Sequence, residues 1–330
     1  MRIHIQNPEA ESIFPLTPEQ WAAALARNPD MAGLQPSFAH DDAGFAAAIG
    51  EAELLITWTK VVHARFGQGG LKALAPKLRT IFCTSAGLDR LAPFAWLPDD
   101  VALLNNRGTH AAKAGEFGLM ALLMLANHIP FFAQAQQRGE WAPRFGSVLA
   151  GRKLVVVGLG SLGGAVAERA AQFGMVVTGV RNTARPHPAC RQVVAQDALD
   201  TVLPEAEFLV LACPLTPETT GLLDRRRLGL LPKGAKLVNI ARGAVWDQDA
   251  VCDALESGHL DGAVTDVMVP EPMPPGHRLW STPGMFVTPH MSADDPNTYN
   301  DNSLDILFQN LRLARQGQEM PNRVIPKRGY

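Results

Sequence analysis

Three polar side chains of different chemistry follow apolar segments in the second half of this 330-residue chain. Arg242 follows KLVNIA, Glu271 lies in VPEPMPP after GAVTDV, and His290 ends MFVTPH. A guanidinium can hold a carboxylate together with an adjacent carbonyl oxygen, which suits a 2-oxo acid. An imidazole exchanges a proton near neutral pH, as the interconversion of a carbonyl and an alcohol requires. A carboxylate hydrogen-bonded to that imidazole would favour its charged form. Together the three residues predict acid–base chemistry on a small anion.

Each of the three residues has a structural alternative when it is taken alone. Arg242 is also compatible with a surface arginine, Glu271 with a solvated loop charge, and a lone histidine is more often structural than catalytic. Of the nine histidines, however, His290 is the one that ends a predicted strand within this half of the chain. The catalytic interpretation therefore depends on the three residues occurring together.

A glycine-rich turn precedes these residues and indicates a dinucleotide. Gly158, Gly160 and Gly163 form GxGxxG directly after KLVVV and before a helical run. The first glycine permits the tight turn, the second lets the backbone reach a pyrophosphate, and the third lets helix and strand pack closely. The N-terminus of the following helix supplies free N–H groups and a positive dipole end for phosphates.

The end of the next apolar segment, MVVTGVRNTARPH, bears on which dinucleotide binds. NAD-binding proteins usually place Asp or Glu there to bond the ribose hydroxyls, and the nearest downstream carboxylate here, Asp197, is too far along the chain. The position and its polar neighbours are instead Arg181, Asn182, Thr183 and Arg185. A cation with hydroxyl and amide neighbours suits a 2′-phosphate, so we expect NADP(H) to be preferred over NAD(H). The alternative is a solvated arginine at a strand end.

Apolar segments of strand length alternate with helical segments through both halves of the chain. The first half contains RIHIQ, ELLITW and LRTIFCTSAG, and TPEQWAAALARN reads as a helix with Thr17 as its N-cap and Pro18 at its first position. The second half contains six such segments: KLVVVG, MVVTGV, EFLVLA, KLVNIA, GAVTDV and MFVTPH. Nearly continuous apolar strands indicate parallel sheets buried on both faces. We therefore predict an α/β protein with two Rossmann-like or flavodoxin-like domains and an active site in the cleft between them.

Two further helices are predicted, one between the two sets of strands and one near the C-terminus. Residues 110–129 are apolar on nearly all sides, which indicates burial on both flanks, either between domains or at a subunit contact. The C-terminal segment TYNDNSLDILFQNLRLARQG is amphipathic, and we expect it to return to the first domain. The predicted domains are a discontinuous substrate-binding domain, residues 1–105 plus 297–330, and an NADP-binding domain, residues 106–296.

Composition excludes several classes of function. Apolar residues make up 47% and charged residues 19%, and the net charge is −2 without a dense run of Lys or Arg, so neither nucleic acid nor a membrane is an expected partner. The four cysteines are scattered without a CxxC pair, which predicts neither a metal site nor disulfides. The N-terminus lacks the apolar core of a signal peptide, and no apolar run has transmembrane length. We expect a cytoplasmic protein.

Over most of its length the chain resembles the D-isomer-specific 2-hydroxyacid dehydrogenase family. The matching segments are GLGSLG, CPLTPETTGLLD, LPKGAKLVNIARG, ALESGHLDGAVTDVMVPEP and the TPH that ends at His290. The resemblance implies that Arg242, Glu271 and His290 are catalytic and that Asp266 lies near the nicotinamide. It also implies that the backbone amides of SAGLD (residues 85–89) hold the substrate carboxylate, at Ala86 and Gly87, with Arg242 and His290 also contacting the substrate. The remaining cofactor contacts that it implies are Ser161, Leu162, Cys213, Pro214, Thr219, Ile240, Ala241 and Ser292.

Within the family, Arg181 makes the chain similar to NADPH-dependent glyoxylate/hydroxypyruvate reductases. The segments GTHAAKAGEFG and SADDP match the family only loosely, which leaves the substrate open. We expect NADPH-dependent reduction of a small 2-oxo acid to the D-2-hydroxy acid, with hydride added at C2 and a proton given by His290. Trp58 and Phe82 are predicted either to shape the substrate site or to pack in the core.

Two alternatives to this function stay open at this point. One is oxidation of a D-2-hydroxy acid in the cell, since the reaction is reversible. The other is a non-catalytic protein that senses the cofactor on the same fold; we expect no added interaction tail after the last predicted helix, which disfavours it. The family resemblance and the apolar helix at 110–129 together predict a homodimer.

Overall fold

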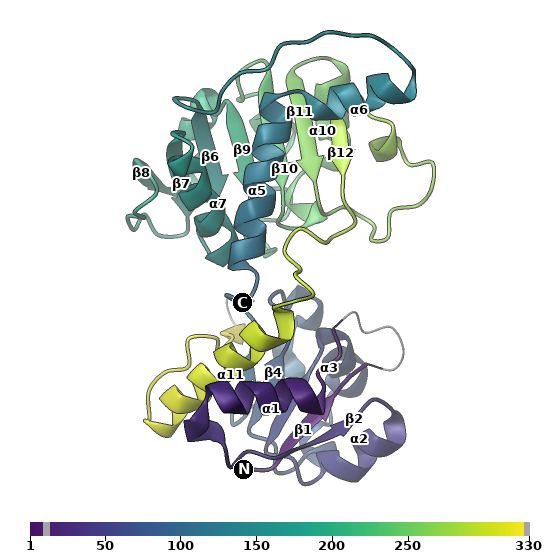
Figure 1. Cartoon of the computed structure of the whole chain (residues 1–330), viewed down its shortest axis with the longest axis vertical. Helices are drawn as coiled ribbons and strands as arrows, with labels where there is room; N and C mark the ends of the chain where they lie inside the picture. Colours follow the sequence, from purple (N-terminus) through teal and green to yellow (C-terminus); the bar gives the residue numbers. More distant parts are fainter. Residues whose placement is uncertain (9–13, 327–330) are drawn as a thin grey trace. The chain divides into compact units, whose positions relative to one another are not determined.

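The computed structural model describes residues 1–8 and 14–326 and divides the chain into two compact units (Figure 1). Unit 1 contains Met1–Thr109 and the segment from Asp295 onward, and unit 2 contains His110–Asp294. Each unit is built on its own parallel sheet, so the predicted α/β class with two parallel sheets is confirmed. The assignment of substrate binding to one domain and of the dinucleotide to the other stays a prediction.

Unit 1 has a five-stranded sheet in the order β2-β1-β3-β4-β5. Its strands are β1 (Ile3–Gln6), β2 (Pro36–Ala39), β3 (Leu54–Thr57), β4 (Thr80–Cys83) and β5 (Ala102–Leu104). Its α-helices are α1 (Pro18–Arg27), α2 (Asp42–Ile49), α3 (Thr59–Phe66), α4 (Leu71–Leu74) and α11 (Tyr299–Arg315), and its short 3-10 helices are Pro29–Met31, Asp89–Leu91 and Phe94–Trp96.

The helices of unit 1 begin and pack as their sequences indicate. The Thr17 side chain accepts from the Gln20 N–H while the Gln20 side chain accepts from the Thr17 N–H, so the predicted N-cap is confirmed as a capping box. Helix α11 confirms the predicted amphipathic helix and lies beside α1 (Figure 1). Its Phe308 meets Trp21 edge to face at 5.3 Å in the core of the unit.

Unit 2 has a seven-stranded sheet in the order β12-β11-β10-β9-β6-β7-β8. Its strands are β6 (Lys153–Val157), β7 (Val176–Arg181), β8 (Gln192–Ala195), β9 (Phe208–Leu211), β10 (Ala235–Asn239), β11 (Leu260–Thr265) and β12 (Met285–Val287). Its α-helices are α5 (Ala111–Ala126), α6 (Ile129–Gln137), α7 (Ser161–Gln172), α8 (Leu199–Val202), α9 (Arg225–Leu228) and α10 (Gln248–Glu256). Its 3-10 helices are Gln196–Ala198, Leu203–Glu205, Gly243–Val245 and Arg278–Trp280.

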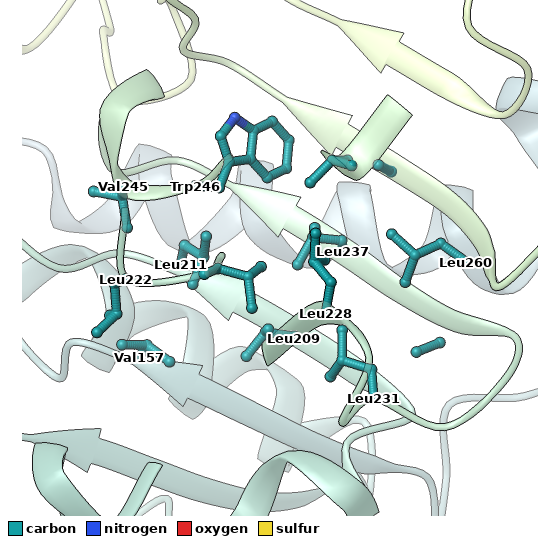
Figure 2. Packing of buried hydrophobic residues seen from close by; sticks show 14 of the residues in the cluster. Val157, Leu209, Leu211, Leu222, Leu228, Leu231, Leu237, Val245, Trp246 and Leu260 are labelled. Carbon is teal, nitrogen blue, oxygen red and sulfur yellow. The ribbon is translucent and has the colours of Figure 1, made fainter. Parts of the chain in front are cut away.

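The sheet of unit 2 is buried on both faces. On one face, side chains from β6, β9, β10 and β11 pack with the segments that follow them, including Leu222, Leu228, Leu231 and Trp246 (Figure 2). On the other face, helices α5 and α7 lie against each other and cover Leu154, Val156 and Val238. The six predicted strands are all present, which fits their nearly continuous apolar sequences.

Two sequence expectations for unit 2 were wrong in detail. The sheet has a seventh strand, β8, which is short, lies at the edge and is only partly buried, so its apolar pattern is weak. The single helix predicted over residues 110–129 ends at Ala126, because His128 has a left-handed backbone with φ of 54°. A second helix, α6, starts at Ile129 and is bent by 67° from the first.

Among the described residues, no single helix has the length and hydropathy needed to cross a membrane. Helices α5 and α6 have the required length and hydropathy only when the two are counted together across the bend between them.

Candidate active site

The candidate catalytic residues of unit 2 all follow strands of its sheet, on the side where the strands have their carboxyl ends. Because β6, β7, β10, β11 and β12 are parallel, their carboxyl ends lie along the same edge. This edge carries Arg242 just after β10, Asp266 directly after β11 and His290 just after β12. Open α/β sheets bind their ligands at this edge.

The imidazole of His290 is paired with the carboxylate of Glu271. His290 Nδ1 lies 3.0 Å from Glu271 Oε2, and Glu271 Oε1 accepts a hydrogen bond of 3.1 Å from the Met268 N–H. A carboxylate only accepts hydrogen bonds, so Nδ1 carries a proton and Nε2 is the nitrogen that can gain or lose one. The structure thus brings these two predicted residues together.

The carboxyl group of Glu271 is tuned toward its charged form. Burial alone would raise its pKa, but the hydrogen bonds from His290 and Met268 and the charges of His290 and Arg242 outweigh it. The net effect is a pKa below the usual value for a glutamate. Glu271 is therefore a charged partner for the imidazole throughout the neutral range.

His290 has a backbone conformation that non-glycine residues rarely adopt. Its φ is +54°, in the left-handed region, where such strain commonly marks a functional residue. Its N–H donates to the main-chain oxygens of Asp266 at 2.9 Å and Thr288 at 3.1 Å. These bonds hold the strained turn at the end of β12.

Asp266 supports the same turn through its side chain. Its carboxylate accepts from Thr288 Oγ1 at 2.6 Å, from the Met291 N–H at 2.9 Å and from the Ser292 N–H at 2.9 Å. The residue is 1% exposed. A carboxylate offers about four acceptor positions, and these bonds occupy three of them; the expected contact with the nicotinamide stays a prediction. Its visible role is to hold residues 288–292.

Arg242 is half-buried at the end of β10. Its Nη1 donates to the Ala241 oxygen at 2.8 Å, and Asn239 Nδ2 donates to the Arg242 oxygen at 3.2 Å. The next residue, Gly243, packs so closely on β11's continuation that a Cβ there would lie 2.3 Å from the carbonyl carbon of Met268. This contact fixes the backbone of Arg242 beside the segment that carries Glu271.

The glycine turn has the geometry that a dinucleotide requires. Gly158 has φ of +94°, and a Cβ on it would lie 2.6 Å from the Cys213 backbone. A Cβ on Gly163 would lie 1.9 Å from the Gly158 oxygen, whereas one on Gly160 would meet nothing within 4 Å. Helix α7 starts at Ser161, directly after Gly160. The turn is thus packed where it must be tight and open where a pyrophosphate would approach.

The predicted 2′-phosphate residues lie together at the end of β7. Arg181 is the last residue of that strand and is half-buried, and Asn182, Thr183 and Arg185 follow it on the surface. Asp197 lies beyond β8 in a separate 3-10 helix. The structure keeps this cationic strand end accessible to a ligand.

The other predicted contacts fall into two groups. In unit 2, Thr219 Oγ1 donates to the Pro214 oxygen at 2.6 Å and so shapes the loop after β9. Cys213 starts that loop, and the remaining members lie at the same sheet edge: Leu162, Ile240, Ala241 and Ser292. In unit 1, Ala86 and Gly87 follow β4, a unit apart from Arg242 and His290.

The structure also separates the two aromatic candidates of unit 1. Phe82 is 0% exposed and belongs to the core. Trp58 lies just after β3 and stacks on Tyr299, with ring centroids 6.3 Å apart.

One residue that contacts the loop after β12 was missed from the sequence. His110, immediately before α5, donates from Nδ1 to the Ala293 oxygen at 3.1 Å. It is 8% exposed and interacts electrostatically with Arg242 and His290. Its segment, GTHAAKAGEFG, has no motif that would have marked it. Within the described part of the chain, no group of three or more His, Cys, Asp or Glu side chains is placed to hold a metal ion.

Comparisons with known proteins show which family the chain is similar to. Residues 119–292 match the family model of the D-isomer specific 2-hydroxyacid dehydrogenase, NAD binding domain. The chain is 31% identical over 280 residues to D-3-phosphoglycerate dehydrogenase of Mycobacterium tuberculosis, covering 84% of this chain and 52% of that protein. It is 32% identical over 260 residues to glyoxylate/hydroxypyruvate reductase B of Pectobacterium carotovorum, covering 77% of this chain and 81% of that protein. The chain thus spans about half the length of the phosphoglycerate dehydrogenases that it matches.

Solved structures resemble the whole chain. A D-isomer specific 2-hydroxyacid dehydrogenase from Xanthobacter autotrophicus Py2, in complex with NADPH and MES, is 31% identical with a TM-score of 0.84 and covers 99% of both chains. A family protein from Aeromonas salmonicida is 28% identical with a TM-score of 0.79, covering 98% of this chain and 99% of that one.

Proposed function

We propose that this chain, which belongs to the D-isomer specific 2-hydroxyacid dehydrogenase family, catalyses the NADPH-dependent reduction of a small 2-oxo acid to its D-2-hydroxy acid. The substrate is of the glyoxylate or hydroxypyruvate kind. The observation that carries the proposal is the pairing of Glu271 with His290, which leaves Nε2 as the proton-exchanging nitrogen. The pair follows strands of the same parallel sheet whose strand β6 leads into the glycine turn. The reductase of Pectobacterium, whose name states this activity, supports the substrate class.

The catalytic residues divide the work between binding and proton transfer. When bound, the nicotinamide supplies hydride chemistry. Arg242 binds the substrate carboxylate and its carbonyl oxygen and stabilises the negative charge that develops there. Charged His290 gives its Nε2 proton to that oxygen and keeps its Nδ1 proton, which it donates in a hydrogen bond to Glu271. The backbone amides of Ala86 and Gly87 are the proposed hydrogen-bond donors to the substrate carboxylate. Acid catalysis of this kind contributes about 10² to 10⁴ in rate.

The preference for NADP(H) rests on the end of β7. Arg181 occupies the position where an acidic residue would bond the ribose hydroxyls, and Asn182, Thr183 and Arg185 lie beside it. These side chains provide the positive charge and the donors that a 2′-phosphate needs. The Xanthobacter relative, which was crystallised with NADPH, supports the choice. Residues 106–296 are the proposed NADP-binding domain, and residues 1–105 with 297–330 the proposed substrate-binding domain.

A panel of 2-oxo acids assayed with NADPH and with NADH in parallel tests both parts of the proposal. We expect consumption of NADPH with at least one small 2-oxo acid, and a His290→Ala variant that binds NADPH but has lost turnover. Equal or better use of NADH refutes the cofactor preference. NADPH binding without turnover on any substrate favours the cofactor-sensing alternative, and faster oxidation of D-2-hydroxy acids favours the oxidative one.

We also propose that the chain forms a homodimer through the outer surface of α5 and α6. Apolar side chains line a groove of about 550 Å³ there, among them Leu119, Met120 and Leu123. The segment after α6 exposes two large aromatic side chains, Trp141 at 96% and Phe145 at 93%. A surface that carries both a groove and protruding aromatics is suited to a second copy of itself.

Sedimentation of the chain and of a Trp141→Glu, Phe145→Glu double variant tests the dimer. We expect a dimer that the double variant converts to a monomer with an unchanged circular dichroism spectrum. A wild-type chain that sediments as a monomer at micromolar concentration refutes this part of the proposal.

A further inference from the structure

The loop that presents His290, residues 288–294, is held at both of its ends. At the first end, Asp266 binds the side chain or N–H groups of Thr288, Met291 and Ser292, as described above. At the second end, His110 Nδ1 lies 3.1 Å from the Ala293 oxygen and 3.7 Å from Asp294 Oδ1. We call residues 288–294 the His290 loop.

The contact with the loop shows which ring nitrogen of His110 carries a proton. A carbonyl oxygen only accepts, so the Nδ1 of His110 carries a proton and donates it to Ala293. The Asp294 carboxylate lies beside the same nitrogen, close enough for an ion pair when His110 is charged. His110 and Asp294 are the first and last residues of unit 2, so this contact ties its two ends together.

His110 is buried and Asp294 is partly exposed, and both lie in the field of the catalytic residues. Burial lowers the pKa of His110 and raises that of Asp294, each against the attraction of the other. The charged groups that act on His110 are Asp294, Arg242 and His290, and Asp266 also acts on Asp294. A proton gained by His110 therefore adds a cation beside two cationic residues of the site.

We propose that His110 is a positioning residue for the reaction. Its Nδ1–H holds Ala293 and thereby keeps the His290 loop in the strained conformation that places the imidazole against Glu271, and its own protonation with Asp294 limits activity at low pH. A buried histidine that only satisfies a carbonyl is the simpler alternative. If His110 positions the loop, a change of its contact with Ala293 that leaves the fold intact alters the backbone at His290 and the rate of turnover. If His110 only satisfies the carbonyl, the same change alters neither. The inference rests on the proposed reductase function.

Two substitutions at one position separate these roles. In His110→Asn the side-chain amide can still donate to the Ala293 oxygen but cannot titrate, and in His110→Leu the donor is lost while an apolar side chain of similar reach remains. A hydrogen bond of this kind corresponds to about 3- to 10-fold. We expect kcat to fall by that factor in His110→Leu with KM for NADPH unchanged, and most of it to return in His110→Asn.

The pH profile supplies a second readout that a purely structural role would not change. Because burial lowers the pKa of His110, its protonation takes place at a pH more acidic than the ordinary range of histidine. In that acidic range the Asn variant should keep a larger share of its optimal kcat than the wild type. Thermal unfolding and NADPH titration serve as controls. The proposal is overturned if His110→Leu stays within twofold of wild type at every pH. It is also overturned if unfolding temperature, NADPH binding and turnover all fall together.

A measurement without turnover distinguishes this inference from the reductase proposal. In isotope-labelled protein, we expect the backbone amide signals of His290 and Met291 to move in His110→Leu and to return toward their wild-type positions in His110→Asn. If they do so in a chain that reduces no 2-oxo acid, the proposed function fails while the positional coupling stands. Signals that stay in place in both variants overturn the coupling.

Discussion

Replacement of Glu271 by glutamine changes one atom of the candidate site and should change its chemistry. The two carboxylate oxygens accept from different donors, Oε2 from His290 Nδ1 and Oε1 from the Met268 N–H. A glutamine has one oxygen and one NH₂ group in the same places. With its oxygen toward Met268, its NH₂ faces Nδ1 and excludes a proton there. With its oxygen toward His290, its NH₂ faces the Met268 N–H. Either orientation sets two donors against each other.

The size of the effect follows from the lost hydrogen bond. A hydrogen bond to a charged group contributes about 1.5–3 kcal/mol. At about 1.36 kcal/mol for each tenfold change in rate, losing it from the charged imidazole predicts a fall in kcat of about 10- to 150-fold. The exposed fraction of the Glu271 side chain is 22%, so solvent screens the pair only partly.

The assay is kcat for the best 2-oxo acid of the panel between pH 6 and pH 9, with NADPH saturating. The lowered pKa of Glu271 keeps its carboxylate charged across this window, because a lowered carboxyl pKa is crossed only at more acidic pH. Glu205→Gln is a matched control, since Glu205 is 69% exposed and pairs with Lys153 at the opposite edge of the sheet. A Glu271→Gln variant within threefold of wild type at every pH would refute the reasoning.

Three further outcomes are expected. Arg181→Asp should raise KM for NADPH by about 10- to 150-fold, the loss of a charge-assisted contact, and should improve the use of NADH; steady-state kinetics with both cofactors check this. Thr17→Ala should lower the free energy of unfolding by about 0.5–2 kcal/mol through loss of the cap, as urea denaturation would show. Asp261→Ala leaves the buried Lys236 unpaired and should cost about 3–5 kcal/mol at neutral pH. Burial would raise the pKa of Asp261, but Lys236 outweighs it and the net pKa is lowered. The stabilisation is therefore present above the pKa of the unfolded carboxyl and is lost as pH falls through the lower, folded value; urea denaturation at pH 7 and at a pH below the ordinary range of aspartate checks both.

Much of the fold was predictable because its signals are local. Nearly continuous apolar runs identify strands that are covered on both faces, and Thr17 with Gln20 identifies a helix start. The strand β8 was missed because an edge strand needs only half of that apolar pattern. The break at His128 was missed because its left-handed backbone is supported by contacts with distant residues, Phe145 and Asp261.

In the candidate site, too, the residues with local sequence signals were predicted and the contact without one was missed. Each of Arg242, Glu271 and His290 lies just after a predicted strand, and parallel strands end at one edge, so their proximity followed from position alone. The pairing of His290 with Glu271 was inferred from residue type. The contact of His110 with Ala293 joins residues 183 positions apart, and no pattern in either segment signals it.

The two acidic residues of this edge illustrate why residue type does not fix a role. Glu271 is partly exposed, and one of its oxygens accepts from an imidazole, so its charge bears on a proton transfer. Asp266 is fully buried and accepts three hydrogen bonds from the His290 loop. A residue in a sparsely populated backbone region costs about 1–3 kcal/mol, and hydrogen bonds to a charged group contribute about 1.5–3 kcal/mol each. Asp266 can therefore support the strained backbone that His290 needs to reach Glu271. The acid–base pair depends on a second carboxylate that takes no part in proton transfer.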